Sequence, residues 1–102
     1  MFVNVKKGKS GSIISVDDTE LTGETVDELK EEAVRLIDQG EKNIILDLSK
    51  TEYIDSSGIG KLLFINKKLI SFGGKMEIIN ITDSLFNFFE TLALDKVIKI
   101  IR

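Results

Sequence analysis

The stretch that decides the fold begins with Ile44-Ile45-Leu46-Asp47-Leu48 and continues, after a short link, as Asp55-Ser56-Ser57-Gly58-Ile59-Gly60. The first segment is an apolar run typical of a central strand, and the second leads into residues 61–72, whose apolar spacing predicts a helix. A helix start carries free backbone N–H groups and the positive end of the helix dipole. The motif therefore places two hydroxyls and one carboxylate where a phosphate can be held or a serine presented to a kinase.

Length and composition limit the classes of protein. With 102 residues, 42% of them hydrophobic, we expect one domain over residues 1–102 with a core of its own. The chain has no cysteine and no signal-like N-terminus, so we expect a cytoplasmic protein. Its apolar runs are too short for a membrane span, and its net charge of −3 gives no general attraction to nucleic acid. We expect neither a membrane nor a nucleic acid as a direct partner.

The missing residue types bear on chemistry. Histidine, cysteine and tryptophan are all absent, which removes the Ser-His and Cys-His nucleophile pairs and the common zinc ligand sets. A Walker-type Gly-rich loop is also absent. We therefore expect no enzyme, no catalytic residue, no metal site and no cofactor.

The hydrophobic patterns alternate between strands and helices. A hairpin opens the chain, an acidic loop follows at 17–23, and Gly40 and Gly73-Gly74 end two helices. The predicted strands cover 2–6, 12–16, 43–49, 75–81 and 97–101, and the predicted helices run from 25 to Gly40, from 61 to 72 and from 82 to about 92. The order ββαβαβαβ predicts an α/β fold whose sheet is mixed but mostly parallel, with helices packed on it.

Finer features give further expectations. Thr25 and Glu28 have the spacing of a capping box, and the strand at 43–49 has the composition of one covered on both faces. The second helix has an apolar stripe made of Ile59, Leu62, Leu63, Leu69, Ile70 and Phe72. The third helix has more apolar side chains than one stripe needs, which favours contact of some of them with a partner or another subunit: Leu85, Phe86, Phe88 and Phe89.

The local role of the motif has several readings. Sites in open α/β sheets lie beyond the carboxyl ends of strands, where the loop after Leu48 delivers Ser56. Either serine can instead be a helix N-cap, and Asp55 can be an N-cap, an Asx-turn residue or a recognition carboxylate. Gly58 and Gly60 are unfavourable in a helix, which indicates either backbone that a partner approaches or tight packing on a neighbouring strand.

Three segments together resemble a known family: Ile44 to Leu48, Tyr53 to Gly60, and Gly73-Gly74-Lys75. They resemble the STAS domain of bacterial anti-sigma-factor antagonists, whose element order is similar over about Ser12 to Ile101. The resemblance implies partner switching, in which the unphosphorylated antagonist binds an anti-sigma-factor serine kinase and frees the sigma factor.

In that family the kinase phosphorylates the serine directly after the aspartate, which is Ser56 here, with Ser57 as the alternative. Phosphorylation abolishes the binding, and a phosphatase resets the switch. Helix N–H groups of residues 57–60 are expected to bind the phosphate locally. The expected partner-binding residues are those of the same motif: Asp55, Ser57, Gly58 and Ile59.

The sequence also departs from the family. The segment from Val16 to Glu24 does not align with the family's glycine followed two residues later by aspartate, so Asp17, Asp18 and Glu24 are all candidates for an acidic partner contact. The family's closing C-terminal helix is expected to be missing or much shortened, which leaves a homodimer open. A second reading of the whole chain is a STAS module that binds a partner or small ligand without phosphorylation.

Overall fold

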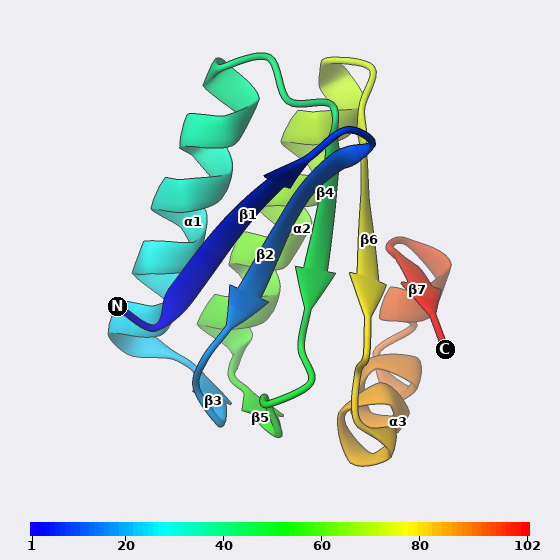
Figure 1. The fold of residues 1–102 in the computed structure, drawn as a ribbon. Helices are drawn as coiled ribbons and strands as arrows, with labels where there is room; N and C mark the ends of the chain where they lie inside the picture. The colour runs from blue at the N-terminus through cyan, green and yellow to red at the C-terminus, as the bar shows by residue number, and fades with distance from the viewer.

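The computed structural model describes residues 1–102 and is built around one five-stranded sheet of order β1-β2-β4-β6-β7 (Figure 1). β1 is antiparallel to β2, and every other pairing in this sheet is parallel. The strands are β1 (Val3–Gly8), β2 (Gly11–Val16), β4 (Asn43–Asp47), β6 (Lys75–Ile79) and β7 (Lys99–Ile101). The helices are α1 (Gly23–Asp38), α2 (Ser56–Ser71), α3 (Asp83–Thr91) and the short 3-10 helix η1 (Leu94–Lys96).

The predicted α/β fold, its opening hairpin and its mostly parallel sheet are confirmed. The prediction missed a second, two-stranded sheet in which β3 (Glu20–Leu21) pairs in parallel with β5 (Tyr53–Ile54). Each of these strands has two residues, too few for a period-2 pattern to be recognised. The last strand is also shorter than predicted, because residues 94–96 form η1 before β7 begins at Lys99.

Only one face of the large sheet is fully covered. Ile44 and Leu46 of β4 are buried, whereas Ile45 and Asp47, which alternate with them along the strand, are only half-buried. The prediction that this strand is covered on both faces is therefore wrong. Helices α1 and α2 lie together behind the sheet in Figure 1, and the opposite face points toward the viewer. β-branched side chains suit the pleated surface of a sheet, which explains an isoleucine on the less covered face as well.

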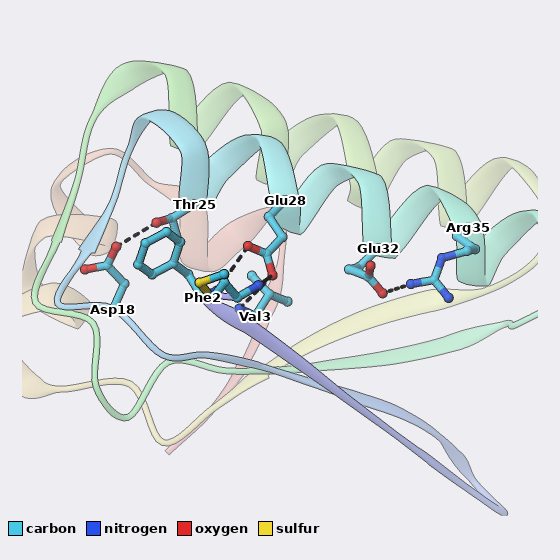
Figure 2. Close-up of polar contacts among 8 residues, drawn as sticks. Phe2, Val3, Asp18, Thr25, Glu28, Glu32 and Arg35 are labelled. Atoms are coloured by element: carbon cyan, nitrogen blue, oxygen red, sulfur yellow. Dashed lines mark hydrogen bonds and ion pairs between the residues drawn. The ribbon is translucent and has the colours of Figure 1, made fainter.

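The start of α1 also differs from the expectation. Thr22 is the N-cap and makes no side-chain cap bond, so the predicted capping box of Thr25 and Glu28 is wrong. The Thr25 hydroxyl donates to Asp18 at 2.6 Å instead. Figure 2 shows Glu28 turned toward the first residues of β1, where its carboxylate accepts from the N–H of Phe2 at 3.0 Å and of Val3 at 3.1 Å, and pairs with the N-terminal amine. The Thr25 and Glu28 side chains therefore bond α1 to two other segments, the loop at Asp18 and the start of the chain.

The predicted stripe of α2 is correct in its middle and wrong at its end. Leu62 and Leu69 are buried, and Ile59 and Leu63 are half-buried against the core. Ile70 and Phe72 are 58% and 53% exposed, respectively. Ile70 lies about 100° around the helix from Leu69, and Phe72 follows the last helical residue as the C-cap.

Some apolar side chains of α3 are buried in the core and others are exposed, as the composition of the helix indicated. Leu85 and Phe89 enter the core, Phe88 is 41% exposed, and Phe86 lies under the Arg102 guanidinium at 4.1 Å from ring centroid to Cζ. Whether the exposed ring of Phe88 meets a partner stays a prediction.

Candidate functional site

The motif lies at the carboxyl end of the sheet, as expected. β4 ends at Asp47, the chain passes through β5, and α2 begins at Ser56 beside the small β3–β5 sheet (Figure 1). The pairing of Leu21 with Ile54 brings the start of α1 next to the start of α2. Two helix N-termini with their free N–H groups are thus gathered around one surface.

Asp55, and neither serine, caps α2. Its carboxylate accepts a hydrogen bond from the Gly58 N–H at 2.9 Å, and its extended backbone is that of an N-cap residue. The reading of Ser56 or Ser57 as the N-cap is therefore wrong. Both serines are exposed in the first helical turn, and neither hydroxyl makes a hydrogen bond within the chain. The cap leaves these two hydroxyls free to react.

The cap also changes which N–H groups can meet a phosphate. The N–H of Gly58 is bonded to the Asp55 carboxylate, and the N–H of Ile59 donates to the Asp55 carbonyl at 3.0 Å. The expectation that residues 57–60 supply the N–H groups is thus too broad. The N–H groups of Ser56 and Ser57 have no backbone acceptor and remain available at the positive end of the helix.

The surroundings of the two glycines of the motif differ, so their presence in the helix is explained differently. Gly58 is buried, and a Cβ there would lie 2.6 Å from Ile54 Cγ1 and 2.7 Å from the Leu21 carbonyl oxygen. Tight packing therefore explains this glycine. Gly60 is exposed, and a Cβ there would have no neighbour within 4 Å. No contact within the fold explains Gly60, which leaves bare backbone one turn beyond Ser56.

The other motif residues differ in accessibility. Ile54 is buried, Ile59 is half-buried, and Tyr53 is 54% exposed. The surface beside Ser56 therefore has Tyr53 on β5 and part of Ile59 on α2, whereas Gly58 shapes it from beneath.

The acidic loop presents only one of its three candidate carboxylates freely. Asp18 accepts from the Thr25 hydroxyl and from the Glu20 N–H at 3.2 Å, and the Thr25 bond in particular holds its pKa below the usual range. Asp17 accepts from Lys50 Nζ at 2.6 Å, which raises the pKa of Lys50. Glu24 makes no ion pair.

The structure adds two carboxylates that sequence reasoning missed. Glu20 lies opposite Tyr53 in the β3–β5 pair, and Glu52 directly precedes Tyr53. Both are exposed. The pairing of two-residue strands brings them together, and no local sequence signal could have shown it.

The largest hollow lies elsewhere. It measures about 650 Å³ between α1 and α2, and Val34 is the one apolar residue of its lining. Small-molecule sites are mostly apolar, so this hollow is a poor candidate for one. No three acidic, histidine or cysteine side chains are grouped so that they could hold a metal ion. None of the helices combines the length and the apolar character needed to cross a membrane.

Comparisons with known proteins bear on the family. A family model described as STAS domain matches residues 4–102. The protein named "Putative anti-sigma factor antagonist BtrV", from Bordetella bronchiseptica, is 28% identical over 64 residues, which are 63% of this chain and 55% of the relative. The matched part thus spans about half the length of that relative.

Solved structures share the fold. The NMR structure of TM1081, a Thermotoga maritima protein, has a TM-score of 0.86 and 26% identity over 99% of this chain and 80% of its own. The anti-sigma factor antagonist SpoIIAA in its unphosphorylated form has a TM-score of 0.81 over 98% of this chain and 88% of its own. The phosphorylated form of SpoIIAA, from Bacillus, has a TM-score of 0.75 over 98% of this chain and 91% of its own. SpoIIAA is 20% identical, so this likeness concerns the fold.

Proposed function

Because the chain belongs to the STAS domain family, we propose that it is an anti-sigma-factor antagonist that acts by partner switching. Membership of the family confirms the resemblance that the sequence predicted. In the proposed switch the unphosphorylated chain binds an anti-sigma-factor serine kinase and frees a sigma factor. Phosphorylation of Ser56 abolishes that binding, and a phosphatase restores it. The proposal assigns the chain no catalytic residue of its own.

The observation that carries the proposal is that Asp55 caps α2 whereas the Ser56 hydroxyl takes no part in the cap. Asp55 caps α2, so the Ser56 hydroxyl is exposed and has no hydrogen bond to lose when it is modified. A phosphate adds a charge of about −1.5 to −2 and three acceptor oxygens. The free N–H groups of Ser56 and Ser57 are suited to hold it. The modified chain then keeps its fold, and the change falls on the surface that the partner covers.

The expected contact surface is small and specific. Ser57 and Ile59 border Ser56 on α2, one carboxylate oxygen of Asp55 is left after capping, and Gly58 sets the close packing beneath them. Glu24 is the acidic candidate that no other side chain neutralises. A dianion buried in such a contact must lose its hydration, and each ~1.4 kcal/mol of lost binding energy corresponds to a tenfold weaker affinity.

Kinase treatment tests the assignment. The chain is incubated with its candidate serine kinase and ATP, and any phosphate is located by mass spectrometry. We expect the phosphate on Ser56. Phosphate on Ser57 alone would contradict the choice of serine. If neither serine is modified, the chain is a STAS module that binds a partner or ligand without switching.

Binding measurements test the mechanism. We expect Ser56→Ala to bind the kinase as the wild type does and Ser56→Asp to bind at least tenfold more weakly, measured by calorimetry. Ser84→Asp is the matched control, because Ser84 is also exposed in the first turn of a helix, α3. Equal affinities of the Ser56→Ala and Ser56→Asp variants would rule out the charge mechanism.

A further inference from the structure

The two ends of the molecule have opposite uncompensated charge. Around the β3–β5 pair, four carboxylates make no ion pair: Glu20, Glu24, Glu52 and Asp55. In the middle of this acidic end the ring of Tyr53 is 54% exposed. The one lysine of the adjoining loop, Lys50, is already paired with Asp17.

The opposite end of α2 carries the complementary charges. Lys42, Lys67 and Lys68 make no ion pair, and α2 contains no acidic residue. The ring of Phe72 is 53% exposed, with Lys42 Nζ at 5.9 Å and Lys68 Nζ at 5.5 Å from its centroid. We name Lys42, Lys68 and Phe72 the Phe72 cluster.

A neighbouring carboxylate does not neutralise the Phe72 cluster. Glu41 turns inward, where it accepts from the Ser12 hydroxyl and from the N–H of Lys42. The Ser12 bond in particular holds the pKa of Glu41 below its usual range. Lys42 Nζ donates to the Phe72 carbonyl oxygen at the end of α2, and neither lysine of the cluster pairs with a carboxylate.

The Phe72 cluster sits on backbone that is held in place. The Gly74 N–H donates to the Leu69 carbonyl and the Lys75 N–H to the Lys42 carbonyl, each at 2.7 Å. A Cβ on Gly74 would lie 2.2 Å from the Lys42 carbonyl oxygen, so the turn after α2 presses directly on the segment that bears Lys42. Because this turn is already ordered in the free chain, the binding of another surface here restricts little more than the motion of side chains.

Helix dipoles account for part of this arrangement. Acidic groups near helix N-termini and lysines near a C-terminus are favourable within the fold itself. The dipole does not explain why each charged end exposes an aromatic ring, Tyr53 at one and Phe72 at the other. A charged rim around an apolar centre is how a protein contact surface is built. In Figure 1 the β3–β5 pair lies beside the start of α2, and the turn that follows α2 and leads into β6 lies at the other end of the helix.

We propose that copies of this chain associate head to tail, with the Phe72 cluster of one copy seated on the acidic end of the next. Each end supplies the charge that the other lacks, which is why the occupant is a second copy. Such a contact joins two different surfaces, so it builds rings or open chains of copies instead of closed two-fold dimers. It covers the first turn of α2, so an associated copy shields its Ser56. The association itself does not depend on whether a kinase recognises Ser56.

Sedimentation velocity on the full chain tests this association. We expect the mean sedimentation coefficient to rise with protein concentration at about 0.01 M salt. We expect the rise to vanish near 1 M salt, where the Debye length is only about 3 Å. A chain that stays monomeric at millimolar concentration in low salt would overturn the proposal.

Charge reversal at each end gives a sharper test. We expect Lys42→Glu with Lys68→Glu, and separately Glu20→Lys with Glu52→Lys, to weaken self-association at least tenfold. An equimolar mixture of the two variants should regain the association that each loses alone, because the intact acidic end of the Lys42→Glu, Lys68→Glu copy meets the intact Phe72 cluster of the other copy. Thermal unfolding verifies that both variants remain folded.

The control changes the same charge elsewhere. Lys6→Glu with Lys96→Glu reverses two exposed lysines on β1 and η1 and should associate as the wild type does. If this control loses association equally, only net charge matters and the head-to-tail contact is wrong. Retained association of both end variants would equally contradict it.

Discussion

The Asp55 carboxylate accepts a hydrogen bond from the Gly58 backbone N–H at 2.9 Å, and this bond starts α2. The two residues come from the same motif, and the residues between them are the two exposed serines. Because Asp55 makes the cap bond, neither serine hydroxyl is needed to cap the helix. The proposed phosphorylation site is thereby kept separate from the bond that caps the helix.

Removal of the cap should reduce stability, whereas removal of the serine hydroxyl should not. We expect Asp55→Ala to lower the free energy of unfolding by about 1 kcal/mol, and Asp55→Asn, which is also a good cap, by much less. Ser56→Ala should lie within about 0.5 kcal/mol of the wild type, as surface changes usually do. Urea denaturation measures all three. If Ser56→Ala lowered the free energy of unfolding as much as Asp55→Ala does, the Ser56 hydroxyl would have a structural role, which contradicts this prediction.

The two glycines of the motif form a matched pair. Gly58→Ala should destabilise the chain by about 1–3 kcal/mol, because its Cβ would press on Ile54 and on the Leu21 carbonyl. Gly60→Ala should instead stabilise it by about 0.5–1 kcal/mol, since alanine favours the helix and nothing lies nearby. The same denaturation experiment compares them. If both substitutions stabilise the chain, packing at Gly58 is looser than its contacts indicate; if both destabilise it, the prediction for Gly60 is wrong.

Phosphorylated Ser56 should leave the fold in place. We expect NMR chemical-shift changes to concentrate in residues 55–60, with the amide signals of Ser56 and Ser57 among the largest, because their N–H groups are free to meet the phosphate. Signals of the sheet should move little. Widespread changes across β2, β4 and β6 would mean that modification rearranges the domain instead of its surface.

Acid should loosen the N-terminal strand through Glu28. The N-terminal amine, followed by the Phe2 N–H, holds the pKa of Glu28 below its usual value. A carboxyl group with a lowered folded-state pKa stabilises the fold at neutral pH, and this contribution is lost as pH falls from about 4.3 through the folded-state pKa. We expect Glu28→Gln to flatten the dependence of stability on pH in this range. Glu24→Gln is the control, because Glu24 forms no ion pair, and it should retain the wild-type dependence.

The site was predictable in position but not in its internal arrangement. Apolar periodicity and helix stop signals located the strand before the motif and the helix after it, because those signals lie within a few neighbouring residues. The capping box of Thr25 and Glu28 was wrong because both side chains bond to segments distant in sequence, Asp18 and the start of β1. A local pattern cannot reveal such competition.

By itself, the sequence determined the order of the helices α1 to α3 and of the strands of the large sheet, the mixed character of that sheet, and the placement of Ser56 at a helix start beyond a central strand. These follow from local hydrophobic spacing and turn residues. Only the tertiary structure decided that Asp55 caps the helix, that Gly58 is packed while Gly60 is bare, and that Tyr53 and Phe72 are exposed among opposite charges. The packing of Gly58 and the surroundings of Tyr53 depend on which distant segment comes to lie alongside, above all the pairing of β3 with β5. That pairing involves too few residues to leave a periodic signal in the sequence.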